Sequence, residues 1–274
     1  MKMTDYPAIT KFTEDQIMIV DGNGGTKKIT IADAILAALH MTSPTNHRMV
    51  FRGKNLGTVV TTEQMAAIQA GTFEDLWLGD YWVINGVTWR IVDFDYWYNK
   101  GDTACTKHHV VIMPDDMLYE SRMNADNTTN GGYVGSEMYT TNLANAKAAI
   151  ASAFGDSVVT HREWLCNNVA NGMPYGANYY DSSIELPNEI MILGHTINSP
   201  ATHSDKMSNL YTTSATQLAL FANIPHHVVR KRHSFWLRDV VTSYAFAYIG
   251  HDSTPGLANA SSNDIGVCPV FAIG

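Results

Sequence analysis

Two patterns of apolar and polar residues follow one another along the chain, one with the period of a strand and one with the period of a helix. Residues 16–20 and 27–31 alternate around a Gly-rich turn, which predicts a β-hairpin. Apolar side chains then recur at helical spacing from Ala32 to Leu39, which predicts a short helix. Some 40 residues bury too little apolar surface for independent stability, so we expect this piece to pack on something else.

The stretch from Met41 to Arg48 has no hydrophobic period and contains Ser-Pro-Thr-Asn, which is typical of a linker. We therefore divide the chain into a short N-terminal segment, residues 1–45, and one larger domain, residues 46–274.

The larger domain mixes strands and helices. The clearest signal is a hairpin over residues 78–92 around Asn-Gly, and Gly71 and Gly155 close two predicted helices. These patterns predict an α+β fold. The remaining predicted elements are a first helix at 62–70, a strand at 109–113, a second helix at 142–154, a short helix at 161–168, a long irregular loop at 171–215, a strand running from 234 through 249, and a last apolar stretch at 265–273.

Composition narrows the classes of function. The 274 residues carry a net charge of −8, and only 16% are charged, so we expect no nucleic-acid partner. No run approaches about 18 consecutive apolar residues, so we expect no membrane insertion. Residues 1–13 lack the pattern of a signal peptide, which indicates synthesis in the cytoplasm. The three cysteines are too few and too widely spaced for a disulfide framework or a metal knuckle.

Candidate catalytic and metal-binding residues are present without the required spacing. The histidines form no i, i+4 pair with a carboxylate, and adjacent histidines such as His108 and His109 point to opposite faces of a strand. No Gly-x-Ser-x-Gly turn precedes a helix, which argues against a hydrolase. We therefore expect no catalytic residue, no metal and no cofactor.

Most aromatic residues between positions 77 and 98 alternate along predicted strands. We expect the majority of them, and Trp236, in the core, although such rings also stack on sugars.

The predicted strand after Asp239 has one face of larger side chains and one of small ones. Small residues on the second face suit inward packing, so we expect the larger rings on the outer face. Rigid rings followed by short polar residues resemble a binding surface, although an ordinary subunit contact looks the same. The predicted ligand-binding residues are Tyr244, Phe246, Tyr248, His251, Asp252, Ser253, Asn259, Ser261 and Asn263.

Several short motifs match those of known proteins. Segments 78–82, 94–99 and 107–111 (Leu-Gly-Asp-Tyr-Trp, Phe-Asp-Tyr-Trp-Tyr-Asn and Lys-His-His-Val-Val) resemble structural proteins of gut-bacterial phages. The ending, with Trp-Leu-Arg-Asp at 236–239, Asn-Ala-Ser-Ser-Asn at 259–263 and Gly-Val-x-Pro at 266–269, is similar to a C-terminal subdomain. C-type-lectin-like folds, formylglycine-generating-enzyme-like folds and the variable proteins of diversity-generating retroelements share that subdomain. Residues 19–29 resemble the start of phage tail and fibre proteins.

The chain departs from these families in two places. Members usually carry Arg where Cys268 stands, so a buried arginine at that position is missing. The catalytic relatives need a pair of neighbouring cysteines, and Cys268 has none nearby in sequence.

Residue usage at the C-terminus bears on diversification. Retroelement mutagenesis acts on AAC and AAT codons, whose products never include Lys, Glu, Gln, Met or Trp. All residues of these five types lie before Asp239, although about six would be expected after it. A packed terminal strand and loop rich in small residues explains the same observation.

The resemblance implies a C-type-lectin-like domain whose C-terminal strand and loop bind a host-surface protein or glycan. It also implies a non-catalytic protein of the virion, attached to other virion proteins through residues 1–45 and displayed as a homo-oligomer. The alternatives are an architectural capsid or tail decoration protein, or an enzyme of the formylglycine-generating or glycan-cleaving type.

Overall fold

The computed structural model of the chain describes residues 17–22, 25–30, 44–199, 213–228 and 232–274. The chain divides into two compact units between Asn46 and His47. In the first unit, β1 (Ile17–Gly22) pairs with β2 (Gly25–Thr30) in the antiparallel hairpin that the alternation predicts. The helix predicted from Ala32 to Leu39 lies outside the described residues.

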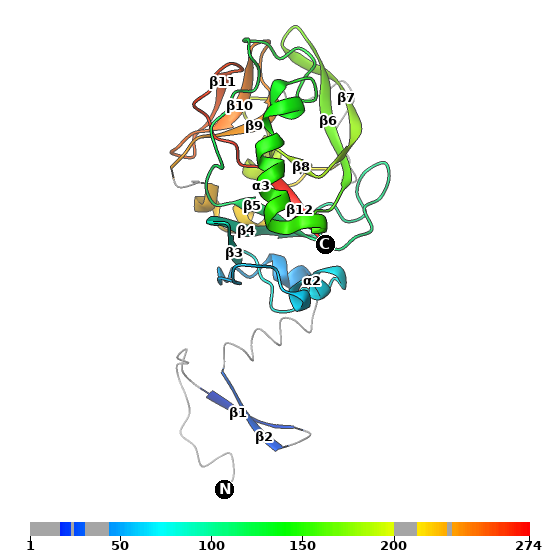
Figure 1. Cartoon of the computed structure of the whole chain (residues 1–274), viewed down its shortest axis with the longest axis vertical. Helices are drawn as coiled ribbons and strands as arrows, with labels where there is room; N and C mark the ends of the chain where they lie inside the picture. The colour runs from blue at the N-terminus through cyan, green and yellow to red at the C-terminus, as the bar shows by residue number, and fades with distance from the viewer. Residues whose placement is uncertain (1–16, 23–24, 31–43, 200–212, 229–231) are drawn as a thin grey trace. The chain divides into compact units, whose positions relative to one another are not determined.

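The second unit is α+β, with mostly antiparallel sheets and few helices, as predicted. Its main sheet has five strands in the order β3-β4-β5-β12-β8, and a smaller sheet has the order β11-β10-β9. Figure 1 shows the main sheet in the lower half of this unit with α2 below it, and β9–β11 and the β6–β7 hairpin above. The main-sheet strands are β3 (Tyr81–Ile84), β4 (Val87–Phe94), β5 (Val110–Pro114), β8 (Ile184–Glu185) and β12 (Val270–Ile273).

Local signals fix the first elements of this unit. A 3-10 turn, Pro44–Arg48, leads into it, and the helix α2 (Thr62–Gln69) begins at Thr61, whose hydroxyl caps Gln64 in a capping box. Strands β3 and β4 meet at Asn85 and Gly86, both with positive φ, as a tight hairpin turn requires. The predicted helix at 62–70 and the predicted hairpin around Asn-Gly are confirmed.

The helix α3 (Ala144–Phe154) packs on the main sheet through aromatic side chains. Phe154, Trp89 and Phe271 lie with ring centroids 5.2–5.6 Å apart. A π-helical turn, Met138–Asn142, precedes the helix, and Gly155 ends it at positive φ, followed by a 3-10 turn to Ser157. The sequence repeats Leu143, Ala146, Ile150 and Phe154 at helical spacing, which predicts one apolar face, and all four are buried.

Two predictions for the middle of the chain are wrong. Residues 161–168 form no helix but belong to β6 (His161–Ala170), which pairs with β7 (Met173–Ser182) in a long hairpin. The first part of the predicted irregular loop, residues 173–182 and 184–185, is therefore strand. The structure also places a short helix α4 (Glu189–Leu193) there, followed along the chain by α5 (Ala219–Asn223) and a 3-10 turn, Pro225–Val228.

The interior consists of two adjoining apolar clusters. The larger lies around the main sheet and holds most of the aromatic residues predicted to be buried, including Trp82, Trp89, Tyr96 and Trp97. The smaller lies between α3 and the small sheet and contains Trp236. In the parts of the chain that the structure describes, no helix is long and apolar enough to cross a membrane.

Candidate functional site

The strand predicted to carry the binding surface is broken in the structure. Strand β9 (Phe235–Val240) ends at a tight turn, and β10 (Ala245–Ile249) runs back beside it. The amides of Val241 and Thr242 both donate to the carbonyl oxygen of Ala245, at 3.0 and 3.2 Å. The polypeptide reverses at residues 241–244, so the single alternating face expected from 240 to 248 does not exist.

Phe246 is wrongly placed by the sequence. Its side chain is fully buried in the smaller cluster with Trp236 and Val240. The small residues Ala247 and Ile249 on the other face of β10 pack into the larger cluster. Both faces of β10 are therefore covered. Along this strand the two sets of alternating side chains enter two different apolar clusters, and neither set as a whole faces solvent.

The two tyrosines near Phe246 differ in exposure. Tyr244, in the turn, is 45% exposed. Tyr248 is half-buried, with its ring over Gly256 and edge-on to Trp236 at a centroid distance of 6.5 Å. Of these two tyrosines, Tyr244 is therefore the more exposed.

The polar residues predicted for the site separate into two groups. Strand β11 (Pro255–Asn259) pairs with β10, so His251, Asp252 and Ser253 lie at one end of this hairpin. Asn259, Ser261 and Asn263 lie near its other end, beside Tyr244, whose carbonyl accepts from the Ala260 amide at 2.8 Å. A strand rises about 3.3 Å per residue, so the five-residue β10 separates the two groups by roughly 13 Å.

The turn holding His251 is closed by its own residues. The Asp252 carboxylate accepts from the Thr254 amide at 3.0 Å, which lowers the pKa of Asp252, and Ser253 has a φ of 71°. These contacts give Asp252 and Ser253 a structural role.

Two segments absent from the sequence prediction adjoin the Tyr244 group. Asn127 accepts from the backbone and hydroxyl of Ser261 at 3.2 and 2.6 Å. Thr129 donates its amide to Ser243 and its hydroxyl to Thr242. At the tip of the β6–β7 hairpin, Gly172 lies so close to the turn that an added Cβ would stand 2.7 Å from the Ser243 nitrogen.

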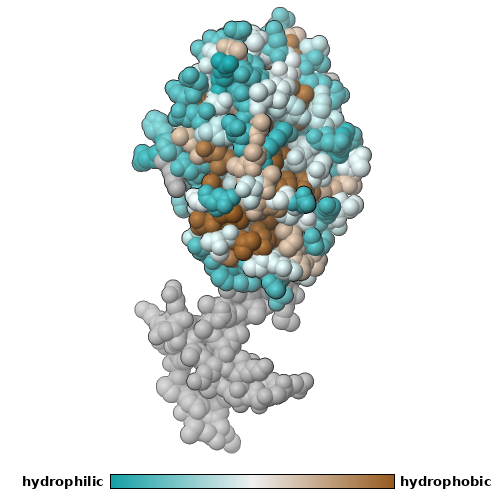
Figure 2. Space-filling view, viewed as in Figure 1, coloured by the Kyte–Doolittle hydropathy of each residue, from teal (hydrophilic) through white to brown (hydrophobic). Residues whose placement is uncertain are grey.

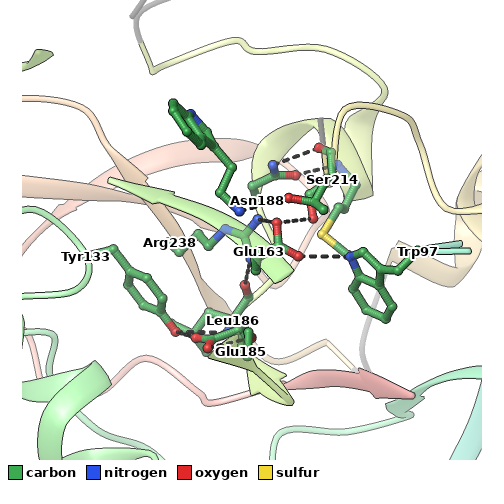
Figure 3. Close-up of polar contacts among 12 residues, drawn as sticks. Trp97, Tyr133, Glu163, Glu185, Leu186, Asn188, Ser214 and Arg238 are labelled. Atoms are coloured by element: carbon green, nitrogen blue, oxygen red, sulfur yellow. Dashed lines mark hydrogen bonds and ion pairs between the residues drawn. The ribbon is translucent and has the colours of Figure 1, made fainter. Parts of the chain in front are cut away.

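A buried carboxylate, Glu163 on β6, ties this hairpin to the rest of the unit (Figure 3). One oxygen accepts from Arg238 at 3.0 Å and from the Ser214 hydroxyl at 2.8 Å. The other accepts from the indole of Trp97 at 2.9 Å. Burial alone would raise the pKa of Glu163, but the charge of Arg238 and the hydrogen bond from His161 outweigh it and hold the pKa at about 2.

A second buried carboxylate, Glu185, lies near Arg238. Glu185 accepts from the hydroxyls of Ser182 and Tyr133 at 2.7 and 2.8 Å, and burial raises its pKa. Arg238 also donates to the carbonyl oxygen of Leu186 at 3.4 Å. Figure 3 shows these groups directed toward one another within the interior. The arrangement joins β6, β8 and β9, and so stiffens the frame that carries Tyr244.

Sequence reasoning missed this network. The available signal was the alternation His161-x-Glu163-x-Leu165, which has the two-residue period of a strand. Two of its three inward residues are polar, so the pattern does not look like a buried strand. A buried arginine does occur in this chain, at position 238 on β9, while Cys268 is buried among apolar residues.

A shallow groove of about 410 Å³ lies between α2 and the end of α3. Its walls include Val59, Met65, Ala66 and Phe154, and none of its lining residues is ionisable. Figure 2 shows apolar side chains gathered in the lower half of this unit, across α2, β3 and the lower end of α3. Among the described residues, no three His, Cys, Asp or Glu side chains are placed to hold a metal ion.

Comparison with known proteins gives no relative. No protein-family model, curated protein or solved structure matches the chain. The chemistry of its own residues is therefore the basis for a functional assignment.

Proposed function

We propose that this chain is a non-catalytic phage virion protein that recognises a host-surface ligand through its C-terminal turn and loop. One observation carries the proposal: Tyr244, Asn259 and Asn263 are exposed at one end of the small sheet, whose strands β9 and β10 are largely buried. A recognition surface needs adaptable side chains on a frame that keeps its shape, because ordering a flexible frame costs affinity.

The contacting set in this proposal is smaller than the sequence predicted. Phe246 is excluded by its burial, and Tyr248 contributes only its exposed edge. His251, Asp252 and Ser253, at the far end of the β10–β11 hairpin, form a separate patch.

The finer fold assignment, a C-type-lectin-like domain, belongs to the same proposal. The C-terminal strand β12 inserts between β5 and β8 in the main sheet, and the small sheet β9–β11 directly precedes it in sequence. A small sheet followed by a C-terminal strand within the main sheet supports the similarity to the C-terminal subdomain that residues 236–239 and 259–269 indicate.

The assembly in this proposal is a homo-oligomer made in the host cytoplasm and carried on the virion. The first 45 residues attach it to other virion proteins, and several copies raise a weak single-site affinity by multivalency. The net charge of −8 supports the absence of a nucleic-acid partner.

A purely architectural role is the second candidate, because the open groove beside α2, whose walls mix apolar residues such as Met65 with polar ones such as Gln69, is a surface that a second subunit can cover. An enzyme is less well supported. Glu163 and Glu185, two of the carboxylates with displaced pKa values, are buried and accept hydrogen bonds from neighbouring side chains, whereas a catalytic group has to reach its substrate.

Adsorption blocking tests the proposal. Purified full-length protein, added to host cells before the virions, is expected to occupy the receptor and reduce adsorption. A Tyr244→Ala, Asn259→Ala variant is expected to block poorly. A matched variant at the opposite end of the unit, Met49→Ala, is expected to block like the wild type. Equal blocking by all three proteins, or none by any, contradicts the proposal.

A further inference from the structure

Several segments of the second unit lack charged residues altogether, and four of them adjoin the turn that holds Tyr244. They contain no Asp, Glu, Lys or Arg, whereas 16% of the whole chain is charged. The four segments are residues 127–136, 164–180, 240–250 and 253–263.

These segments, far apart in sequence, lie together. Thr129 bonds to Thr242 and Ser243, Asn127 bonds to Ser261, and Gly172 abuts Ser243. The amide of Val134 donates to the carbonyl oxygen of Cys166 at 3.1 Å, which links the first two segments directly. We call the exposed part of these four segments the uncharged surface.

The uncharged surface combines rings with amides. Eight large apolar side chains are exposed among the described residues. Four of them belong to the uncharged surface: Met173, Tyr175, Tyr244 and Leu257. Tyr175, on the hairpin, is 53% exposed. The same four segments carry exposed amide side chains at Asn127, Asn130, Asn168, Asn171, Asn178, Asn259 and Asn263. Each amide both donates and accepts hydrogen bonds without bringing a charge.

The charged residues that border these segments are acidic. The flanking positions are Asp126, Glu137, Glu163, Asp181, Asp239, Asp252 and Asp264, with His251 between the last two segments. The nearby cation Arg122 is paired with Glu137 at 3.1 Å. Glu163 is buried, and none of the other acidic residues that flank the four segments in sequence offers a cation to an anionic ligand.

We propose that the uncharged surface binds a neutral glycan, with Tyr175 and Tyr244 against sugar ring faces and the asparagines on sugar hydroxyls. This inference rests on the proposed function and names its ligand class. On a typical protein surface, roughly a quarter to a third of the residues are charged. The charged groups of a protein ligand would lose their water on binding here without gaining an oppositely charged partner. A neutral glycan brings hydroxyls and C–H faces only, which rings and amides satisfy.

The site is larger than the C-terminal segment alone. It includes the tip of the β6–β7 hairpin, which nothing in the sequence of the last forty residues indicates. Tyr175 is consequently the residue that separates this inference from the proposed function.

A glycan array tests the inference with the full-length protein. The array carries neutral hexose and N-acetylhexosamine oligosaccharides beside sialylated, uronic-acid and sulfated ones. Binding to neutral members is expected, with affinity nearly unchanged between about 0.01 M and about 1 M NaCl, where the Debye length falls from roughly 30 Å to roughly 3 Å. Tyr175→Ala and Tyr244→Ala are each expected to weaken binding about tenfold, and Met49→Ala to leave it unchanged.

Two treatments of host cells distinguish failure of the glycan inference from failure of the proposed host recognition. Periodate oxidation of surface sugars is expected to abolish binding of the protein to cells, and protease treatment to leave it intact. Binding that resists periodate and is lost with protease overturns the glycan inference while the proposed host recognition stands. Preference for acidic glycans with steep salt dependence overturns it as well. No binding to untreated cells overturns both.

Discussion

Arg238 and Glu163 form an ion pair of 3.0 Å with both side chains buried, and it joins β9 to the β6–β7 hairpin. The two strands carry the neighbouring parts of the uncharged surface, the turn with Tyr244 and the hairpin with Tyr175. The pair thus links the interior directly to the geometry of the proposed site.

Removing the charge of Glu163 should destabilise the protein strongly. Glu163→Gln removes the carboxylate that is ion-paired with Arg238. It also replaces one of the two accepting oxygens by an NH2 group, which then faces a donor, either Arg238 or the indole N–H of Trp97. Breaking one partner of a buried pair costs about 3–5 kcal/mol. Urea unfolding measures the free energy of unfolding. The exposed Glu74→Gln is the control, expected within about 0.5 kcal/mol of wild type. Equal stability of the two variants contradicts the assigned role of Glu163.

Asp239 should make the stability depend on pH. Burial, and then the negative charge of Glu189, raise its pKa to about 7, with Arg238 opposing the shift. Because the pKa of Asp239 is higher in the folded state, its protonation stabilises the fold. This stabilisation is complete below the unfolded-state pKa of about 3.9 and is lost as pH rises through about 7. Glu163 acts oppositely, because its stabilisation is lost only as pH falls from about 4.3 toward 2.

The variant Asp239→Asn keeps an oxygen that accepts from the Glu189 amide and removes the titration. Its free energy of unfolding should fall less than that of wild type between pH 5 and pH 8. Parallel pH profiles for the two proteins would show that Asp239 titrates normally.

Phe246 and Tyr244 should respond in opposite ways to truncation. Phe246→Ala empties a buried site and is expected to cost about 3–5 kcal/mol of stability. Tyr244→Ala, at an exposed position, is expected to change stability by less than about 0.5 kcal/mol. Thermal and urea unfolding measure both. A stable Phe246→Ala variant would place the ring back at the surface.

Gly172 should tolerate a methyl group less well than Gly86. Both have a φ of 77°, so alanine is strained at each by about 1 kcal/mol. Only at position 172 does the new Cβ meet backbone, 2.7 Å from the Ser243 nitrogen, whereas nothing lies within 4 Å of it at position 86. Gly172→Ala should lose roughly 1–3 kcal/mol more than Gly86→Ala. Equal losses measured by urea unfolding would show that the hairpin tip does not dock on this turn.

Elements with local signals were predictable from the sequence. The Asn85-Gly86 turn, the helix predicted at 62–70 and the helix stop at Gly155 depend on neighbouring residues alone, and all three form as expected. The α+β class follows from the same signals.

Elements that depend on distant partners were not predictable. Strand β6 buries Glu163, whose partners Trp97, Ser214 and Arg238 are more than fifty residues away, so its inward face does not look apolar in the sequence. The hairpin tip belongs beside Tyr244 through the contact of Gly172 with Ser243, which no local pattern reveals. The polar part of the C-terminal site was visible as a run of short residues, but its division into two ends required the register of β10 with β11.

The most direct test of host recognition at the uncharged surface is a binding isotherm of labelled full-length protein on host cells with one charge introduced. Asn259→Lys places a cation on the proposed surface, and Ala151→Lys places the same cation on the exposed side of α3. The account predicts that Asn259→Lys weakens binding at least about tenfold and that Ala151→Lys binds like wild type. Unchanged binding of Asn259→Lys, with wild-type protein bound to the cells, would contradict recognition through this surface.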